Sequence, residues 1–263
     1  MAGQAVLLEL IHTLGAFNEA IVVIGGSVPP LLYPQAANEY VGTLDIDLAL
    51  SETLTDETYE TIRKVLIKRG YREHKEQPFI FFRDVSMPDG EKIMVQVDLL
   101  TKEYGGTGKS HRTQKIQDIR ARKVRGCDLA FINFKQVEIT GELPEGGTDK
   151  VKCKVAGIVA FLTMKGMALA SRMKEKDSWD IYYCLVHHPG GIEKLVGEFK
   201  AFKNNRLVRE GLVKIGEKFE SPDHIGPKHI VDFEEIVEND ERIRIQRDAF
   251  ERVNYLLTEL DLR

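Results

Sequence analysis

The sequence has few cysteines, no excess of positive charge and no long hydrophobic run. Its 263 residues include three cysteines, Cys127, Cys153 and Cys184, which are scattered without a C-x-x-C or Cys/His pairing. That spacing argues against a disulfide framework and a structural zinc site, and it indicates buried thiols in a reducing compartment. The formal net charge of -4 argues against a globally basic nucleic-acid-binding protein, so any such contact must be local.

Neither a membrane span nor a signal peptide is expected from this sequence. The longest nearly uncharged run, residues 155–170, is shorter than the ~20 apolar residues that cross a bilayer, and it contains Lys165. The N-terminal segment is apolar but carries Glu9 and His12 at helical spacing, without a basic leader or a small-residue cleavage site. We therefore expect a cytoplasmic protein with no membrane partner.

The hydrophobic periodicity predicts strands and helices up to a boundary near residue 154, and only helices after it. The expected strands are 21–24, 44–50, 78–83, 93–100, 129–133, 136–140 and 151–155, with a turn at the MPDG segment between the third and the fourth. The expected helices before the boundary are 2–18, 28–33 and 53–69.

Two acids stand out in the expected strand at residues 44–50. Asp45 and Asp47 are two residues apart, so the period of a strand places both carboxylates on one face and apolar side chains on the other. Two like charges side by side repel each other unless something neutralises them. A bound divalent cation would do so, because pairs of carboxylates suit magnesium. The alternative is that both acids are solvated on an exposed strand face.

Two further features favour the cation. The segment Gly25–Ser27 follows an expected strand and can place backbone N–H groups and a hydroxyl against a phosphate. A third acid, Asp98, lies on the less apolar face of a later expected strand, where it meets Asp45 and Asp47 if the two strands are neighbours. Three strand carboxylates and a glycine turn are the minimum set for metal-assisted phosphoryl or nucleotidyl transfer.

Positive charge is concentrated between Lys102 and Arg125, a stretch with eight basic and two acidic residues. The simplest interpretation is a solvated loop and helix face. The functional interpretation is a basic flap beside the carboxylates, which would hold a polyanionic acceptor or the triphosphate. Arg120, Arg122 and Arg125 are the candidate acceptor-binding residues.

A single lysine interrupts the apolar stripe of the expected helix that begins near residue 156. Lys165 is the only charged residue in the run 155–170, and Arg172 returns to nearly the same helical face. Because an unpaired buried ammonium is costly, Lys165 requires a protein carboxylate, a ligand phosphate or an extended path to solvent. Glu175, Asp177 and Asp180 are available for local pairing, which is the structural interpretation of this basic face.

Together these motifs resemble the polymerase-β-type nucleotidyltransferase superfamily and, within it, the AbiEii/AbiGii-like group, which is often found as the toxin of toxin–antitoxin or abortive-infection pairs. The resemblance covers roughly residues 20–187. Its motifs are the turn Gly25, Gly26 and Ser27, the Thr-x-Asp-x-Asp strand with Thr43, Asp45 and Asp47, the acid Asp98, the helical Lys165, and a closing segment with Lys176, Asp177, Asp180 and Tyr182. The chain departs from the family pattern at Val41 and Gly42, where a basic residue is often present.

The resemblance implies an α+β fold: a mixed β-sheet nucleotidyltransferase core with flanking helices at residues 1–154, then an all-helical domain at residues 155–263 that contributes Lys165. It implies transfer of a nucleoside monophosphate from an NTP to an acceptor hydroxyl, with release of pyrophosphate. Asp45, Asp47 and Asp98 would bind two Mg²⁺ ions, with Mn²⁺ as an alternative, and would act with Lys165 in catalysis. The implied nucleotide-binding residues are Gly25, Gly26, Ser27, Thr43, Lys165, Arg172 and Asp180.

The expected acceptor is an RNA 3′ end, particularly that of tRNA, ahead of a protein side chain. The basic stretch suits a polyanion, and the family's association with toxins adds an antitoxin protein as an implied partner. The alternative from another class is a catalytically inactive nucleotide-sensing or protein-binding module on the same fold. A phosphatase or nuclease with the same carboxylates is a third interpretation, although it would make less use of the glycine turn and Lys165.

Overall fold

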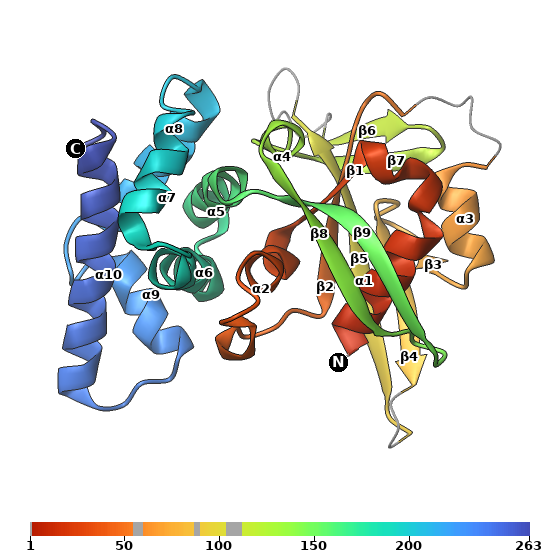
Figure 1. The fold of residues 1–263 in the computed structure, drawn as a ribbon, viewed down its shortest axis with the longest axis horizontal. Helices are drawn as coiled ribbons and strands as arrows, with labels where there is room; N and C mark the ends of the chain where they lie inside the picture. The colour runs from red at the N-terminus through yellow and green to blue at the C-terminus, as the bar shows by residue number, and fades with distance from the viewer. Residues whose placement is uncertain (1, 55–59, 87–89, 104–111) are drawn as a thin grey trace. The chain divides into compact units, whose positions relative to one another are not determined.

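The computed structural model describes residues 2–54, 60–86, 90–103 and 112–263 (Figure 1). The chain divides into two compact units. The first consists of residues 1–32 and 41–157, and the second of residues 33–40 and 158–263. The sequence predicted a single boundary near residue 154, whereas a short early segment, residues 33–40, belongs to the second unit.

The first unit is built on a mixed β-sheet. Its strands are β1 (Ile21–Ile24), β2 (Asp45–Leu50), β3 (Arg72–Glu73), β4 (Ile80–Ser86), β5 (Lys92–Lys102), β6 (Thr113–Ile116), β7 (Ile119–Val124), β8 (Phe134–Glu142) and β9 (Thr148–Ala156). Its helices are α1 (Ala2–Thr13), α2 (Val28–Leu32), α3 (Ile62–Lys68) and α4 (Leu129–Ile132), with 3-10 turns at Gly15–Ala20 and Gly25–Ser27. The sheet order is β3-β4-β5-β2-β1-β9-β8, and the β6–β7 hairpin joins it where β7 pairs with β5.

One face of this sheet is apolar and covered by a helix. β2 and β5 are parallel neighbours, and the buried residues Ile46 and Val97 lie side by side on this face. Helix α1 packs on this face of the sheet. Its buried Glu9 accepts two hydrogen bonds from Arg83 of β4. Arg83 in turn lies opposite Val95 in the β4–β5 ladder. Alternate residues of β2 and β5 therefore point away from α1.

One predicted strand is wrong. Residues 129–133 were expected to be extended, but residues 129–132 form the short helix α4, with Leu129 and Ala130 buried. A brief apolar run is compatible with either structure, because its periodicity is too short to decide. The neighbouring strands β8 and β9 confirm the predicted ones at 136–140 and 151–155. β4 and β5 pair antiparallel, as a hairpin requires, but part of the expected turn, residues 87–89, lies outside the described residues.

The helix expected at 53–69 is shorter than predicted. It begins at Ile62, because Thr61 has an extended backbone and its side chain accepts a hydrogen bond from a main-chain N–H of the first turn. Residues 55–59 of the expected helix lie outside the described residues. The predicted end at Gly70 is confirmed, and this glycine has a φ of 96°.

The β6–β7 hairpin, which carries most of the described basic stretch, is fixed at its tip. The side chain of Gln117 accepts a hydrogen bond from the Ile62 N–H at 3.1 Å. Beside it, the Thr61 hydroxyl donates to the carboxylate of Asp118 at 2.5 Å. The start of α3 therefore holds the hairpin in place. Residues 104–111 of the basic stretch lie outside the described residues.

The second unit is helical, as predicted for the C-terminal region. Its helices are α5 (Ile158–Arg172), α6 (Glu175–His187), α7 (Gly191–Lys200), α8 (Arg206–Gly216), α9 (Ile225–Phe233) and α10 (Asn239–Glu259), and the 3-10 turn Ala37–Glu39 belongs to it. Helices α5 and α8 approach closely at glycines. A Cβ atom added to Gly211 would lie 2.7 Å from the main-chain oxygen of Thr163, and one on Gly166 would lie 2.2 Å from that of Gly211. Only glycine fits at these two positions.

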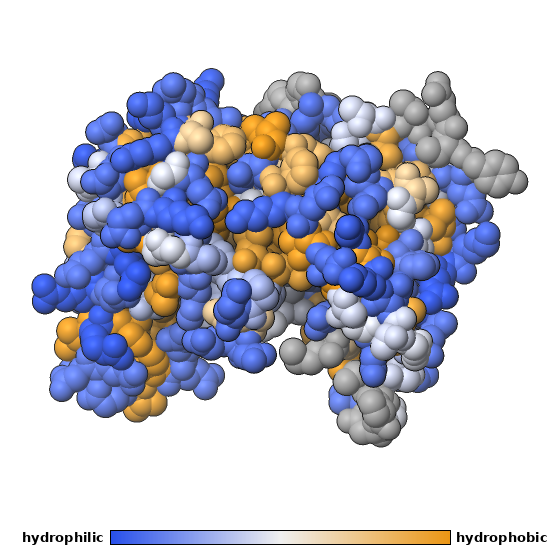
Figure 2. Space-filling model, in the orientation of Figure 1, coloured by the Kyte–Doolittle hydropathy of each residue, from blue (hydrophilic) through white to orange (hydrophobic). Residues whose placement is uncertain are grey.

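Figure 2 shows one face, on which polar and charged side chains cover most of the described surface with apolar side chains between them. Within the described ranges, none of the helices combines the length and the apolar composition of a membrane span.

Candidate functional site

The three predicted acids lie on two neighbouring strands of the first unit. In the parallel β2–β5 ladder, Asp47 is beside Asp98, and Asp45 is beside Gln96. Residues beside each other in a ladder share a face of the sheet, and adjacent strands are ~4.8 Å apart. Asp98 was expected to meet Asp45 and Asp47 only if their strands are neighbours, and β2 and β5 are neighbours. These four residues are called the acid face below.

The glycine turn packs against the acid strand. β1 ends opposite Asp47, and the chain then turns through Gly25–Ser27. Gly25 has a φ of +68°, and a Cβ atom added there would lie 1.9 Å from Asp47 Oδ2. A Cβ atom on Gly26 would lie 3.0 Å from Cγ2 of Thr43. Glycine at position 25 is therefore required by its backbone conformation and by the approach of the carboxylate.

The surroundings of Asp98 on the acid face act on its pKa in both directions. Burial raises the pKa of Asp98 above its ordinary value, and the neighbouring charge of Asp45 raises it further. A hydrogen bond from Gln96, whose Nε2 lies 2.8 Å from Asp98 Oδ1, and the positive charge of Arg122 act in the opposite direction. A half-buried carboxyl group with a raised pKa beside a second carboxylate is the electrostatic condition that a bound cation would relieve.

The donor atoms of the acid face suit a hard divalent cation, because they are carboxylate and amide oxygens. The side chains are not arranged as a complete metal cage. Within the described ranges, no group of three or more His, Cys, Asp or Glu side chains is placed to hold an ion. One oxygen of Asp98 is engaged by Gln96, and the carboxylate of Asp47 lies against Gly25.

The β6–β7 hairpin brings part of the basic stretch to the same face. Arg122 lies where β7 pairs with β5, two residues beyond Asp98, and it lowers the pKa of that acid. Arg120 and Arg122 are exposed and alternate with buried residues, and Lys115 is directly opposite Arg120. Like charges in this position destabilise a hairpin, so the arrangement suits an anionic partner. Arg125 lies in the turn after β7 and is not part of this strand face.

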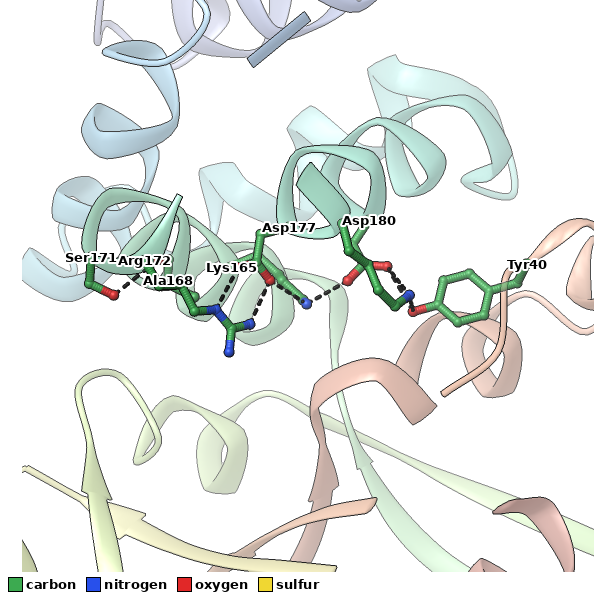
Figure 3. A network of polar contacts seen from close by, with 8 residues as sticks. Tyr40, Lys165, Ala168, Ser171, Arg172, Asp177 and Asp180 are labelled. Atoms are coloured by element: carbon green, nitrogen blue, oxygen red, sulfur yellow. Dashed lines mark hydrogen bonds and ion pairs between the residues drawn. The ribbon is translucent and has the colours of Figure 1, made fainter. Parts of the chain in front are cut away.

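In the second unit, protein carboxylates neutralise the predicted lysine. Lys165 Nζ lies 2.9 Å from Asp177 Oδ1 and 2.5 Å from Asp180 Oδ2, and the residue is 8% exposed (Figure 3). Arg172 donates to Asp177 through Nε and Nη2, both at 2.7 Å. A protein carboxylate, a ligand phosphate and a path to solvent were the expected partners of Lys165. The structure shows two protein carboxylates, those of Asp177 and Asp180.

These residues and Lys176 form a charged cluster in which three cations face two carboxylates (Figure 3). Burial alone would lower the pKa of Lys165, but Asp180 and Asp177 raise it above the usual value. Burial would raise the pKa of Asp177, but Arg172 and Lys165 lower it. The pKa of Lys176 is lowered, mainly by burial. Lys165 and Asp177 are therefore both charged at neutral pH.

No family model, curated protein or solved structure matches this chain. The relation to nucleotidyltransferases therefore stays a prediction from the motifs. Function has to be inferred from two groups of side chains, the acid face in the first unit and the charged cluster in the second.

Gln96 of the acid face, and Lys176 and Asp177 of the charged cluster, were not among the predicted site residues. Neither was Tyr40, which contacts the cluster. Gln96 lies beside Asp45 and bonds to Asp98, and strand alternation, which places it on the face of Asp98, is a signal that could have identified it. Tyr40 donates a hydrogen bond to Asp180 Oδ1 at 2.8 Å, across 140 positions of sequence. No local pattern connects residues that are so far apart in the chain.

A surface cavity of about 340 Å³ lies at the carboxyl end of β2, away from the acid face. Its lining includes Glu52 and Lys102, which pair with each other at 2.6 Å, and Asp128. The lining contains none of the predicted site residues in the described part of the chain, so the cavity adds nothing to the candidate site.

Proposed function

We propose that this chain is a metal-dependent nucleotidyltransferase, which moves a nucleoside monophosphate from an NTP to an acceptor hydroxyl and releases pyrophosphate. The observation that supports this most is the β2–β5 ladder, in which Asp47 and Asp98 share a face and the Gly25–Ser27 turn packs against Asp47. Carboxylates that repel one another reduce the stability of a fold. Their presence beside a glycine turn is therefore better explained by function than by structure.

The chemistry assigns a role to each part of the acid face. The acceptor oxygen attacks the α-phosphorus while the bond to the pyrophosphate oxygen breaks, so the phosphates must be aligned and their charge neutralised. Asp45, Asp47 and Asp98 would hold Mg²⁺, or Mn²⁺ in its place. The metal, when bound, would neutralise phosphate charge and favour loss of the hydroxyl proton. The Gly25–Ser27 turn would bind the terminal phosphates through main-chain N–H groups and a hydroxyl.

The proposal rests on the first unit alone. Lys165 was expected to neutralise the triphosphate, but Asp177 and Asp180 already hold its ammonium group. Catalysis by Lys165, and nucleotide binding by Lys165, Arg172 and Asp180, stay predictions that follow from the resemblance.

For the acceptor, we propose RNA, with the 3′ end of tRNA as the first choice and a protein side chain as the second. The support is the exposed pair Arg120 and Arg122, opposite and beside Lys115, on the face that carries Asp98. Phosphate contacts of this kind position a nucleic acid without reading its sequence. A role as the toxin of a toxin–antitoxin pair, with an antitoxin as partner, follows only from the resemblance.

The test follows the α-phosphate. The protein is incubated with Mg²⁺, total RNA and each of the four NTPs in turn, labelled at either the α- or the γ-phosphate. We expect transfer of the α-label and none of the γ-label, because pyrophosphate leaves with the γ-phosphate. Asp47→Asn should abolish transfer. Asp84→Asn should retain it, because Asp84 is a half-exposed strand acid that pairs with Arg72. Transfer of the γ-label, or full transfer by Asp47→Asn, would contradict the proposal.

A non-catalytic nucleotide-sensing or protein-binding module on the same fold is the second candidate. The incomplete metal cage among the described residues and the fully paired Lys165 favour it. It predicts that NTPs bind but that no acceptor in RNA or cell lysate becomes labelled. It also predicts that Asp47→Asn leaves NTP binding unchanged.

A further inference from the structure

A second group of charged side chains in the first unit lies on the face of the sheet that α1 covers. Arg83 of β4 is opposite Val95 in the ladder, whereas Asp98 alternates to the other face. Arg83 bonds to Glu9 of α1, and Glu9 also lines a cavity of about 290 Å³. The other described lining residues are His12 and Thr13 of α1, Arg69 after α3, and Leu143 in the turn between β8 and β9. This cavity, called the Arg69 cavity below, therefore lies on the opposite side of the sheet from the acid face.

Two arginines already neutralise the carboxylate of Glu9. This residue is 1% exposed and accepts hydrogen bonds from Arg83 Nε at 2.8 Å and from Arg83 Nη2 at 3.0 Å. Arg69 Nη2 lies 2.9 Å from Glu9 Oε2. Two guanidinium groups thus face one buried carboxylate, so the three side chains together carry an excess of positive charge. An anion beside them would not meet an unneutralised Glu9.

A second carboxylate, that of Glu145 in the turn between β8 and β9, reaches the same two arginines. Its side chain is 62% exposed, and its Oε1 accepts a hydrogen bond from Arg83 Nη2 at 2.7 Å. Its Oε2 is 3.7 Å from Arg69 Nη1, which is too far for a hydrogen bond. The bond from Arg83 and the charge of Arg69 lower the pKa of Glu145. The structure thus places an oxyanion beside both arginines, yet Arg69 Nη1 makes no hydrogen bond with it.

Two further polar groups line the Arg69 cavity. His12 Nδ1 lies 2.7 Å from Asp149 Oδ2, so Nε2 is the ring nitrogen left for a ligand. Thr13 is half-buried, and its hydroxyl makes no hydrogen bond with another described residue. Phosphate oxygens accept hydrogen bonds from several directions, and a guanidinium group binds phosphate through paired N–H donors. A guanidinium, a hydroxyl and an imidazole around one cavity therefore suit a phosphate group better than a planar carboxylate.

We propose that the Arg69 cavity is a binding site for a phosphate group, either free or carried by a small molecule. Arg69 is the charged contact, and Thr13 and His12 supply the further polar contacts. Glu145 competes with the ligand, because its carboxylate lies beside the same guanidinium group. The site is separate from the acid face and does not rest on the proposed function.

The test measures phosphate binding by calorimetry at neutral pH and constant ionic strength. The two probes are inorganic phosphate and glycerol 3-phosphate, and the tighter of the two identifies the source of the group. NMR shifts of the His12 ring report binding at this cavity. Arg72→Gln is the matched control for Arg69→Gln, because Arg72 is an exposed arginine of the same unit that pairs with Asp84 at 2.8 Å.

Arg69→Gln should weaken binding of the tighter probe ~10-fold or more, because hydrogen bonds between charged groups are among the stronger ones. Arg72→Gln should bind like the wild type. Glu145→Gln should bind ~2–5-fold more tightly, because a competing exposed charge is removed, and a damaged fold would not produce this gain.

Three results would overturn the proposal. The first is the absence of saturable binding of either probe to both the wild type and Glu145→Gln. The second is an equal loss of affinity in Arg69→Gln and Arg72→Gln, which would indicate general attraction to positive charge. The third is tighter binding of acetate than of both phosphate probes, which would assign the cavity to carboxylates.

Discussion

Replacement of Gly25 by alanine tests the contact on which the acid face depends. An alanine at this position must adopt the left-handed conformation, because φ is +68°, and this costs ~1–2 kcal/mol. Its Cβ atom would also lie 1.9 Å from Oδ2 and 2.7 Å from Cγ of Asp47, so the carboxylate must turn away. Overpacking of this kind costs ~1–3 kcal/mol. We therefore expect Gly25→Ala to lower the free energy of unfolding by ~2–5 kcal/mol.

Urea denaturation of four proteins separates the two contributions: wild type, Gly25→Ala, Asp47→Ala and the double variant. Asp47→Ala removes the two shortest contacts and leaves only its own Cβ atom, at 2.9 Å. Gly25→Ala should consequently cost less in the Asp47→Ala background, by ~1–2 kcal/mol. Gly42→Ala is the control, because nothing lies within 4 Å of its added Cβ atom and its φ is not left-handed. An equal cost of Gly25→Ala in both backgrounds would show that the carboxylate does not lie against Gly25.

Three further substitutions test other parts of the structure. Glu9→Gln should lower the free energy of unfolding by ~1–3 kcal/mol in urea denaturation, because the guanidinium of Arg83 loses the charge of its buried partner and keeps only the exposed Glu145. Gly211→Ala should lower the melting temperature measured by circular dichroism, because its Cβ atom would lie 2.7 Å from a carbonyl oxygen of α5, whereas the uncrowded Gly197→Ala should not. Arg122→Gln should raise the pKa of Asp98 further in an NMR titration, because Arg122 lowers that pKa. Because the pKa of Asp98 is higher in the folded state than in the unfolded chain, the folded state binds more protons at pH values between the two pKa values. Stability therefore falls as pH rises through this range, and Arg122→Gln should widen the range.

The predictions made from strand periodicity agreed well with the structure. It placed Asp45, Asp47 and Asp98 on their strands and on the polar faces of those strands, because alternation is a local property of the backbone. The sequence could not predict that β2 and β5 are neighbours, because strand pairing depends on the whole sheet. The register that places Asp47 beside Asp98 could be learned only from the structure.

The errors have local physical causes. The apolar segment 129–132 was too short to show a period, so a helix was mistaken for a strand. The helix expected from residue 53 begins after Thr61, whose capping role became visible only with the structure. The partners of Lys165 were considered from sequence spacing, but the sequence could not decide between carboxylates and a phosphate. In the structure, Lys165 is buried and pairs with Asp177 and Asp180.

The membership of residues 33–40 in the helical unit affects how this protein can be made and studied. A fragment of residues 158–263 would lack this segment, so Tyr183 would lose a ring neighbour and Asp180 one of its donors. During synthesis, Tyr40 is made 140 residues before Asp180, so this bond cannot form until α6 has been synthesised. Neither unit is a continuous piece of chain, so no single cut in the chain separates the two units intact.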